Sequence, residues 1–206
     1  MLSRRTFFLS PLAVGLLPAA ARAEASPEAI RGASQFIQWL ADQAIAVLGA
    51  SSSTLETREA EFRRLLSQGF AMPFIGRFVL GRYWRTATPE QREDYQELFA
   101  EYILRTYSSR LGGYAGETFN VTGARPAGKQ DILVATRIDR PSGPAIKADW
   151  RVRVFDNEYK IIDIMVEGVS MAVTQRSEFT NVVRSQGFEG LLQALRARTE
   201  RMPAAS

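Results

Sequence analysis

The 206-residue chain contains no cysteine and no histidine. Without cysteine it has no disulfide, thiolate nucleophile, zinc–thiolate site or cysteine-held cluster. Without histidine it has no Ser-His-Asp triad, imidazole metal ligand or imidazole proton shuttle. An enzyme with this sequence is therefore restricted to groups such as carboxylates, hydroxyls, lysine and arginine. The ordinary apolar (46%) and charged (23%) fractions exclude wholesale disorder and predict a globular core.

The first 23 residues have the three-part composition of an export signal. Arg4 and Arg5 form a basic start, an apolar stretch covers residues 7–17, and small residues lead to Ala23. The apolar stretch is much shorter than the roughly 20 residues of a membrane-spanning helix. We predict cleavage after Ala23, and the paired arginines favour a twin-arginine signal over a general secretory one.

Most of the net positive charge belongs to this leader. The chain has 26 basic and 22 acidic residues. The leader contains Arg4, Arg5 and Arg22 but no acid, so cleavage leaves 23 bases against 22 acids, a net charge of +1. A nucleic-acid partner requires a strongly basic surface, and the overall charge of the remaining chain gives no reason to expect one.

Residues 24–201 are predicted to form one α+β domain, followed by a flexible tail at 202–206. Apolar residues at helical spacing predict helices over 29–48, 55–67, 72–80 and about 88–111, and again from Ser177, with a break at Gly187. Alternation predicts strands over 117–122, 132–139, 145–155, 159–167 and 169–174, with a hairpin turn at 156–157. The helical part thus covers about 24–114 and 176–201, and an antiparallel sheet covers about 117–175.

The aromatic residues between Phe70 and Leu111 have two interpretations. Their helical spacing is typical of a packed core, and composition alone favours that interpretation. The recurring tyrosines also suit the wall of an apolar cavity with a wet mouth, because each buried hydroxyl needs a partner. The nearby Arg77, Arg82 and Arg85 are predicted to lie on the solvated surface, with phosphate binding at a pocket rim as the alternative.

Asp163 and Glu167 are the candidates for catalysis, as a general base with a raised pKa. Strand alternation places Asp163 on the solvent face instead, together with Ile161 and Met165. Ile162, Ile164 and Val166 would then face inward. The sequence has no glycine-rich phosphate loop and no spacing typical of metal ligands, so the signal for catalysis is weak.

Two segments carry a family resemblance. Residues 78–92 have the sequence Phe-Val-Leu-Gly-Arg-Tyr-Trp-Arg-Thr-Ala-Thr-Pro-Glu-Gln-Arg, and residues 167–171 have the sequence Glu-Gly-Val-Ser-Met. Together they closely resemble the MlaC / toluene-tolerance family of periplasmic phospholipid-binding carrier proteins, over most of the chain from about Glu56 to Leu195. The resemblance implies a sheet similar to that of nuclear transport factor 2, wrapped by N-terminal and C-terminal helices around an apolar cavity.

The resemblance also implies a function. Acyl chains of a phospholipid insert into the cavity, the head group stays near solvent, and the carrier shuttles lipid between an outer-membrane lipoprotein complex and an inner-membrane ABC transporter. Carriers linked to hopanoid gene clusters belong to the same family, so the lipid class stays open. No cofactor, metal or nucleic acid is expected. The alternatives are a small-molecule enzyme using Asp163 or Glu167 as its base, and a periplasmic adaptor with a filled core and no ligand.

The carrier hypothesis assigns candidate residues to the cavity. The wall candidates are Phe74, Phe78, Val79, Tyr83, Phe99, Tyr102, Ile103, Trp150, Val152, Ile162, Ile164, Val166 and Met171. The head-group candidates are Arg82, Tyr107 and Arg151.

Overall fold

The computed structural model describes residues 25–50, 54–108 and 116–201. The predicted export signal, its cleavage site and the predicted tail lie outside these ranges, as does the end of the helix predicted to reach Leu111. The helices are α1 (Pro27–Gly49), α2 (Leu55–Gly69), α3 (Met72–Leu80), the 3₁₀ turn η1 (Gly81–Arg85), α4 (Pro89–Ser108) and α5 (Met171–Arg201). The strands are β1 (Thr118–Ala127), β2 (Asp131–Asp139), β3 (Ile146–Phe155), β4 (Glu158–Val166) and β5 (Val169–Ser170).

Local capping signals fix where the helices begin. The Ser26 hydroxyl accepts the Ala29 N–H at 3.1 Å and caps α1. At the start of α4, Thr88 accepts the Gln91 N–H at 3.2 Å, and the Gln91 amide oxygen accepts the Thr88 N–H at 3.0 Å. This reciprocal pair is the capping box that the sequence predicts.

The strands form one antiparallel sheet in the order β1-β2-β3-β4-β5. The predicted hairpin turn between β3 and β4 is confirmed, because Asp156 and Asn157 both have left-handed backbone angles, with φ of 47° and 67°. The α+β class and the antiparallel sheet are therefore as predicted.

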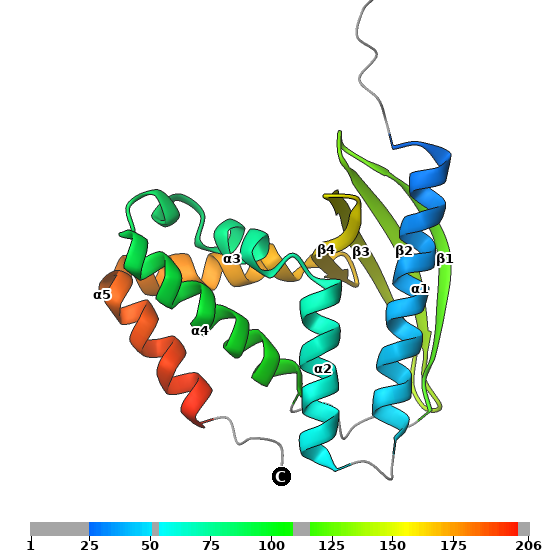
Figure 1. The fold of residues 1–206 in the computed structure, drawn as a ribbon, viewed down its shortest axis with the longest axis horizontal. Coiled ribbons are helices and arrows are strands. Elements are labelled where there is room, and N and C mark those ends of the chain that lie inside the picture. Colours follow the sequence, from blue (N-terminus) through cyan, green and yellow to red (C-terminus); the bar gives the residue numbers. More distant parts are fainter. Residues whose placement is uncertain (1–24, 51–53, 109–115, 202–206) are drawn as a thin grey trace, which may run out of the picture.

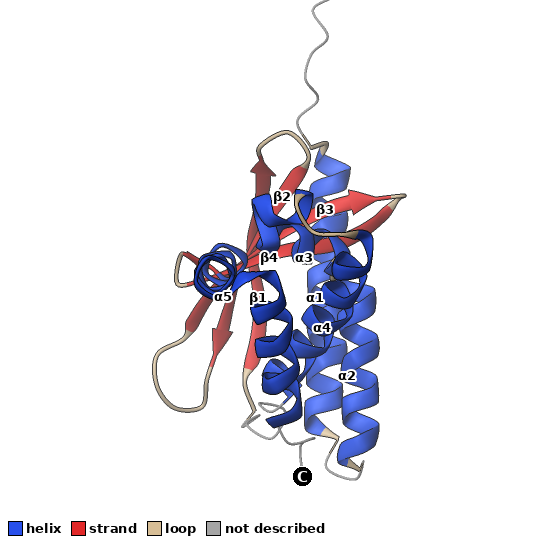
Figure 2. Ribbon diagram, turned by 90° about the vertical axis from the view of Figure 1, so that its left-hand side faces the viewer, coloured by secondary structure: helices blue, strands red, loops and turns tan. Residues whose placement is uncertain are grey.

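The molecule has two packed parts. In the first, α1 lies along one face of the sheet with α2 beside it; in the second, α3, α4 and α5 pack together (Figure 1). Each part has its own buried core, one built around Ile37 and Val152 and the other around Tyr95 and Phe99. The Ala71 N–H donates to the Ile161 carbonyl at 3.0 Å, so the segment between α2 and α3 is tied to the edge of the sheet. Figure 2 shows the sheet from another side, with α5 in front of it.

The predicted strand over 169–174 is wrong beyond Ser170, where α5 begins. The Ser170 hydroxyl accepts the Val173 N–H at 3.1 Å, and an Asp163 carboxylate oxygen accepts the Ala172 N–H at 3.0 Å. These two bonds satisfy the free N–H groups of a first helical turn, so the chain turns helical immediately. The predicted break at Gly187 is confirmed, because its φ of 74° kinks α5.

Alternation also fails within β4. Trp150 lies opposite Ile164, but Val152 lies opposite Ile161, so the register shifts between them. Ile161, predicted on the solvent face with Asp163, is fully buried in the core of the sheet. The physical reason is a β-bulge, which adds one residue to β4 and reverses the side-chain alternation beyond it.

Candidate functional site

An apolar pocket of about 500 Å³ lies where the two packed parts meet. Its lining comes from α1 and α2 on one side, from α3, α4 and the start of α5 on the other, and from strands β1 to β4. The volume falls within the range of pockets that hold small organic ligands. No single element builds this pocket, because each contributes only a few side chains.

The largest contribution comes from α1 and was not predicted. The lining residues of α1 are Ile37, Leu40, Ala41, Ala44, Ile45 and Leu48. Three more come from α2, namely Phe62, Leu65 and Leu66. Their helical spacing was visible in the sequence, but the same stripe is expected for a helix buried against a core. The spacing of these residues in the sequence therefore does not distinguish the lining of a ligand pocket from a packed core.

Several sequence candidates do line the pocket. They are Phe99 and Ile103 of α4, Trp150 of β3, Ile164 of β4, and Met171 of α5. The head-group candidate Tyr107, which is 37% exposed, lies on the same lining.

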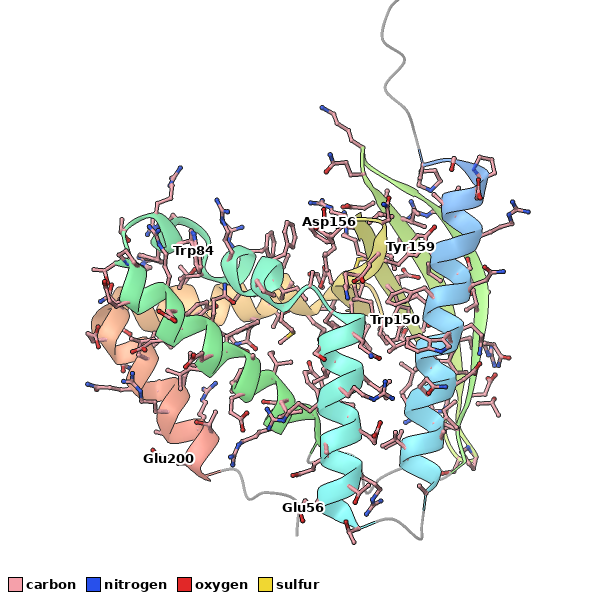
Figure 3. The ribbon with its side chains drawn as sticks, in the orientation of Figure 1. Glu56, Trp84, Trp150, Asp156, Tyr159 and Glu200 are labelled. Atoms are coloured by element: carbon pink, nitrogen blue, oxygen red, sulfur yellow. The ribbon has the colours of Figure 1, made fainter. Side chains whose placement is uncertain are left out.

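Trp150 is held in place by hydrogen bonds. Its indole N–H donates to the Thr136 hydroxyl at 2.9 Å, and that hydroxyl donates to the Ala148 carbonyl at 2.7 Å. Its ring contacts the edge of Phe119, another lining residue, at a centroid distance of 6.0 Å. Figure 3 shows Trp150 between the sheet and the end of α2, far from Trp84. These hydrogen bonds hold the Trp150 ring in place on the wall of the largely apolar pocket.

The lining of this pocket does not include the other wall candidates. Val79 and Tyr102 are buried in the core of the helical part, and Tyr83 packs against it. Val152 is fully buried in the core of the sheet. The remaining ones are Phe74, Phe78, Ile162 and Val166, which the lining does not include. Phe74 packs against Phe155 instead, at 5.7 Å between ring centroids, and Phe78 is 37% exposed.

The two arginine candidates also lie elsewhere. Arg82 stacks on the Tyr83 ring at 4.9 Å and donates to the Tyr83 hydroxyl at 2.9 Å. Arg151 donates to the buried carboxylate of Asp131 at 3.2 Å, and Arg153 donates to the same carboxylate at 2.6 Å. Asp131 therefore holds both arginines on the sheet, and neither Arg82 nor Arg151 belongs to the pocket lining.

The carboxylates suggested for catalysis have structural partners. Asp163 lines the pocket, but its two oxygens accept the Ser170 hydroxyl at 2.6 Å and the Ala172 N–H at 3.0 Å. Glu167 is exposed and accepts the Lys147 N–H at 2.8 Å. These bonds give both acids a role in holding strand ends and the start of α5, which is a different role from that of a free general base.

An ion-pair network joins α2 to α4 beside the pocket. Glu101 of α4 accepts hydrogen bonds from Arg63 of α2 at 2.9 Å and from Arg105 of α4 at 2.6 Å. Burial by itself would raise the pKa of Glu101, but the hydrogen bonds and charges of the two arginines outweigh it and lower this pKa below its usual value. The network therefore ties together two helices that both supply lining residues.

Within the described ranges no group of three or more acidic side chains is arranged to hold a metal ion. None of the helices in the described part of the chain has the length and apolar character needed to cross a membrane.

The fold and the pocket together define a small α+β binding protein with an apolar ligand-sized space between its two parts. The family model described as "MlaC protein" matches residues 38–197. The chain therefore belongs to the MlaC family, which the residues at 78–92 and 167–171 had indicated.

Individual relatives agree with this assignment. The chain is 24% identical over 186 residues to the intermembrane phospholipid transport system binding protein MlaC of Haemophilus influenzae, covering 86% of this chain and 84% of that protein. It is 23% identical over 106 residues to the toluene tolerance protein ttg2D of Pseudomonas putida, covering 52% of this chain and 49% of that protein.

A solved structure shares the fold. It is the phospholipid-binding protein from Ralstonia solanacearum, in complex with a phospholipid, with a TM-score of 0.73 and 24% identity. The match covers 82% of this chain and 98% of the other. The relatives are thus named for phospholipid binding and transport or for toluene tolerance, and none of these names describes an enzyme.

Proposed function

We propose that this protein is a periplasmic carrier that holds phospholipid acyl chains in the apolar pocket and shuttles the lipid between an outer-membrane complex and an inner-membrane ABC transporter complex. The observation that carries the proposal is the apolar pocket of about 500 Å³ lined from both parts of the fold. Membership of the MlaC family and the names of the relatives support it.

The energetics explain why such a carrier needs a pocket and no reactive group. Each buried methylene contributes about 0.8 kcal/mol, so two chains of about sixteen carbons carry on the order of 25 kcal/mol of transfer free energy. A lipid therefore does not cross an aqueous compartment readily without cover. A carrier has to match the bilayer closely enough to load and unload, and the missing histidine and cysteine are compatible with that task.

The direct test is the lipid content of the protein purified from cells. We expect native mass spectrometry and organic extraction to show bound phospholipid, and mass spectrometry of the extract to identify its class. Ile103→Glu and Ile164→Glu each place a carboxylate in the pocket lining and should abolish loading. Val154→Glu is the matched control, because Val154 is 42% exposed and outside the lining. A folded wild-type protein without lipid would contradict the proposal.

The acid/base enzyme is the alternative, and one double variant separates the two. Asp163→Asn with Glu167→Gln removes both negative charges and keeps an oxygen acceptor at each position. A carrier should keep its lipid in this variant, whereas an enzyme relying on either acid should lose its activity. The hydrogen bonds that occupy both acids favour the carrier.

The periplasmic location is part of the same proposal. We infer that residues 1–23 direct export and are removed after Ala23. The exported protein should then begin at Glu24, and its intact mass, measured by mass spectrometry, tests this. Replacing Arg4 and Arg5 with lysine should block export if the twin-arginine route is used, and should leave a general secretory route working.

A further inference from the structure

Five exposed arginines lie where α3, η1 and α5 meet, and we call this surface the arginine face. They are Arg77, Arg82, Arg85, Arg176 and Arg184. Among the described residues none of the five forms an ion pair with an acid, whereas arginines on other elements do, such as Arg63 with Glu101. Figure 1 shows α3 lying along α5, and a Cβ added at Gly81, at the start of η1, would lie 3.0 Å from the Arg176 Nε.

Acidic residues are scarce on the same elements. Residues 72–88 contain no aspartate or glutamate. Residues 171–187 contain only Glu178, whose carboxylate accepts the Gln175 amide at 3.1 Å. These two segments together carry five arginines against one glutamate, so the surface that they form has a local positive excess.

Aromatic rings hold three of these guanidinium groups. Arg176 lies over Phe78 at 5.2 Å, Arg82 over Tyr83 at 4.9 Å, and Arg77 over Trp84 at 5.9 Å from the ring centroid. Stacking itself uses none of the N–H donors of a guanidinium group. Arg82 also donates one N–H to the Tyr83 hydroxyl. Figure 3 shows Trp84 at the end of the molecule remote from α1 and the sheet.

Apolar side chains are exposed among the arginines. Phe78 is 37% exposed and Val173 is 51% exposed. Both line a shallow groove of about 360 Å³ between α3 and α5, together with Arg176 and the polar Ser177, Thr180 and Asn181. The groove is separate from the large pocket, because the two linings share no residue.

We propose that the arginine face binds an anionic lipid bilayer surface, with Phe78 and Val173 contacting the interfacial layer. Lipid phosphates match the bidentate donors of arginine, and exposed apolar and aromatic side chains suit the boundary between head groups and acyl chains. An acidic protein would have to place a fixed carboxylate at each arginine. A bilayer supplies laterally mobile phosphates and accepts apolar side chains at the same time, so the combination of features favours the bilayer.

None of the five arginines lines the large pocket, so binding at the arginine face is independent of the pocket's ligand. The test is co-sedimentation of the purified protein with vesicles of phosphatidylglycerol and phosphatidylcholine, compared with vesicles of phosphatidylcholine alone, at low and high salt. We expect binding only to the anionic vesicles, and weaker binding at high salt. The triple variant Arg77→Gln/Arg85→Gln/Arg176→Gln should bind on the order of a hundredfold more weakly, since each basic residue near an anionic surface contributes about fivefold and the three losses multiply.

The matched control is Arg31→Gln/Arg125→Gln/Lys129→Gln. It removes the same charge from exposed positions on α1, β1 and the turn after β1. Like the arginine-face variant, it leaves residues 1–23 unchanged. It should bind like the wild type. Circular dichroism should show that both triple variants fold, and both should keep the lipid that co-purifies with the wild type. Wild-type protein that is purified without lipid would contradict the proposed carrier function and would leave the membrane-binding proposal unaffected.

Several outcomes would overturn the proposal. Wild-type protein that does not bind anionic vesicles at low salt would do so, as would equal binding to phosphatidylcholine alone. Unchanged binding by a folded arginine-face variant would also contradict it. Binding of poly-glutamate by the wild type, without vesicle binding, would assign the surface to an acidic protein partner instead.

Discussion

Ile161 of β4 lies opposite Val152 of β3, and Asp163 lies opposite Arg151, the residue before Val152. Two steps along β4 therefore match one step along β3, with Ile162 as the additional residue of a β-bulge. The bulge lets Ile161 fill the core of the sheet while Asp163 lines the pocket. One inserted residue thus allows β4 to serve the core and the pocket at once.

Removing the carboxylate at the bulge should destabilise the protein. Asp163→Ala leaves the Ser170 hydroxyl and the Ala172 N–H without their acceptor. We expect a loss of about 1–3 kcal/mol in the free energy of unfolding, measured by urea denaturation. Asp149→Ala on β3 is the control, and it should change the stability by less than about 0.5 kcal/mol. Equal stability of Asp163→Ala and wild type would show that this carboxylate does not hold the start of α5.

Features set by neighbouring residues could be predicted from the sequence. The capping box of Thr88, the hairpin turn at 156–157 and the break at Gly187 each depend on residues within one turn of the chain. The sequence therefore predicted most helices and strands, and the family motifs predicted the class of fold.

Features set by distant contacts could not be predicted in the same way. The start of α5 depends on Asp163, which belongs to another strand, so residues 171–174 were mistaken for a strand. In the sequence, residues that fill a core and residues that line a pocket also follow the same apolar spacing. Trp150 and Val152 are two residues apart and share one face of β3. Val152 is nevertheless fully buried in the core, whereas Trp150 lines the pocket. Only the packing of α1 and α2 against the sheet separates the two cases.

Stability at acid pH should depend on Glu101. Its pKa is lowered in the folded state, because the hydrogen bonds and charges of Arg105 and Arg63 outweigh the opposing effect of burial. The stabilisation from this carboxylate is therefore fully present above its ordinary pKa of 4.5 and is lost as the pH falls through the lower, folded value.

Glu101→Gln should show this as a change in pH dependence. Urea denaturation at about pH 7 should find the variant less stable than the wild type, and the difference should shrink at about pH 3. Glu93→Gln is the control on the same helix, since no ion pair of Glu93 is present among the described residues. A difference in stability that is the same at both pH values would mean that Glu101 acts by packing alone.

Trp150 should report a ligand in the pocket. Variants with Trp150 as their single tryptophan (Trp39→Phe/Trp84→Phe) should lose much of their fluorescence when loaded with a phospholipid brominated on its acyl chains, because Trp150 lines the pocket. Variants with Trp84 alone should be quenched far less in the same vesicle-free complex. Equal quenching of both would place the acyl chains outside this pocket.

The packing of α1 on the sheet should depend on Gly32. A Cβ at this position would lie 2.6 Å from the Tyr159 Cζ, and the Tyr159 ring is stacked on Phe36 at 6.1 Å. Gly32→Ala gains about 1 kcal/mol of helix propensity, but overpacking of this kind costs about 1–3 kcal/mol, so we expect a net loss of stability in thermal or urea unfolding. In a Tyr159→Ala background the overlap is gone, and the same substitution should stabilise the protein by up to about 1 kcal/mol. Gly123→Ala, with open space around its Cβ, is the control for a change that causes no overlap. If Gly32→Ala has the same effect with and without the Tyr159 ring, the close approach of α1 to β4 does not limit which residue can occupy position 32.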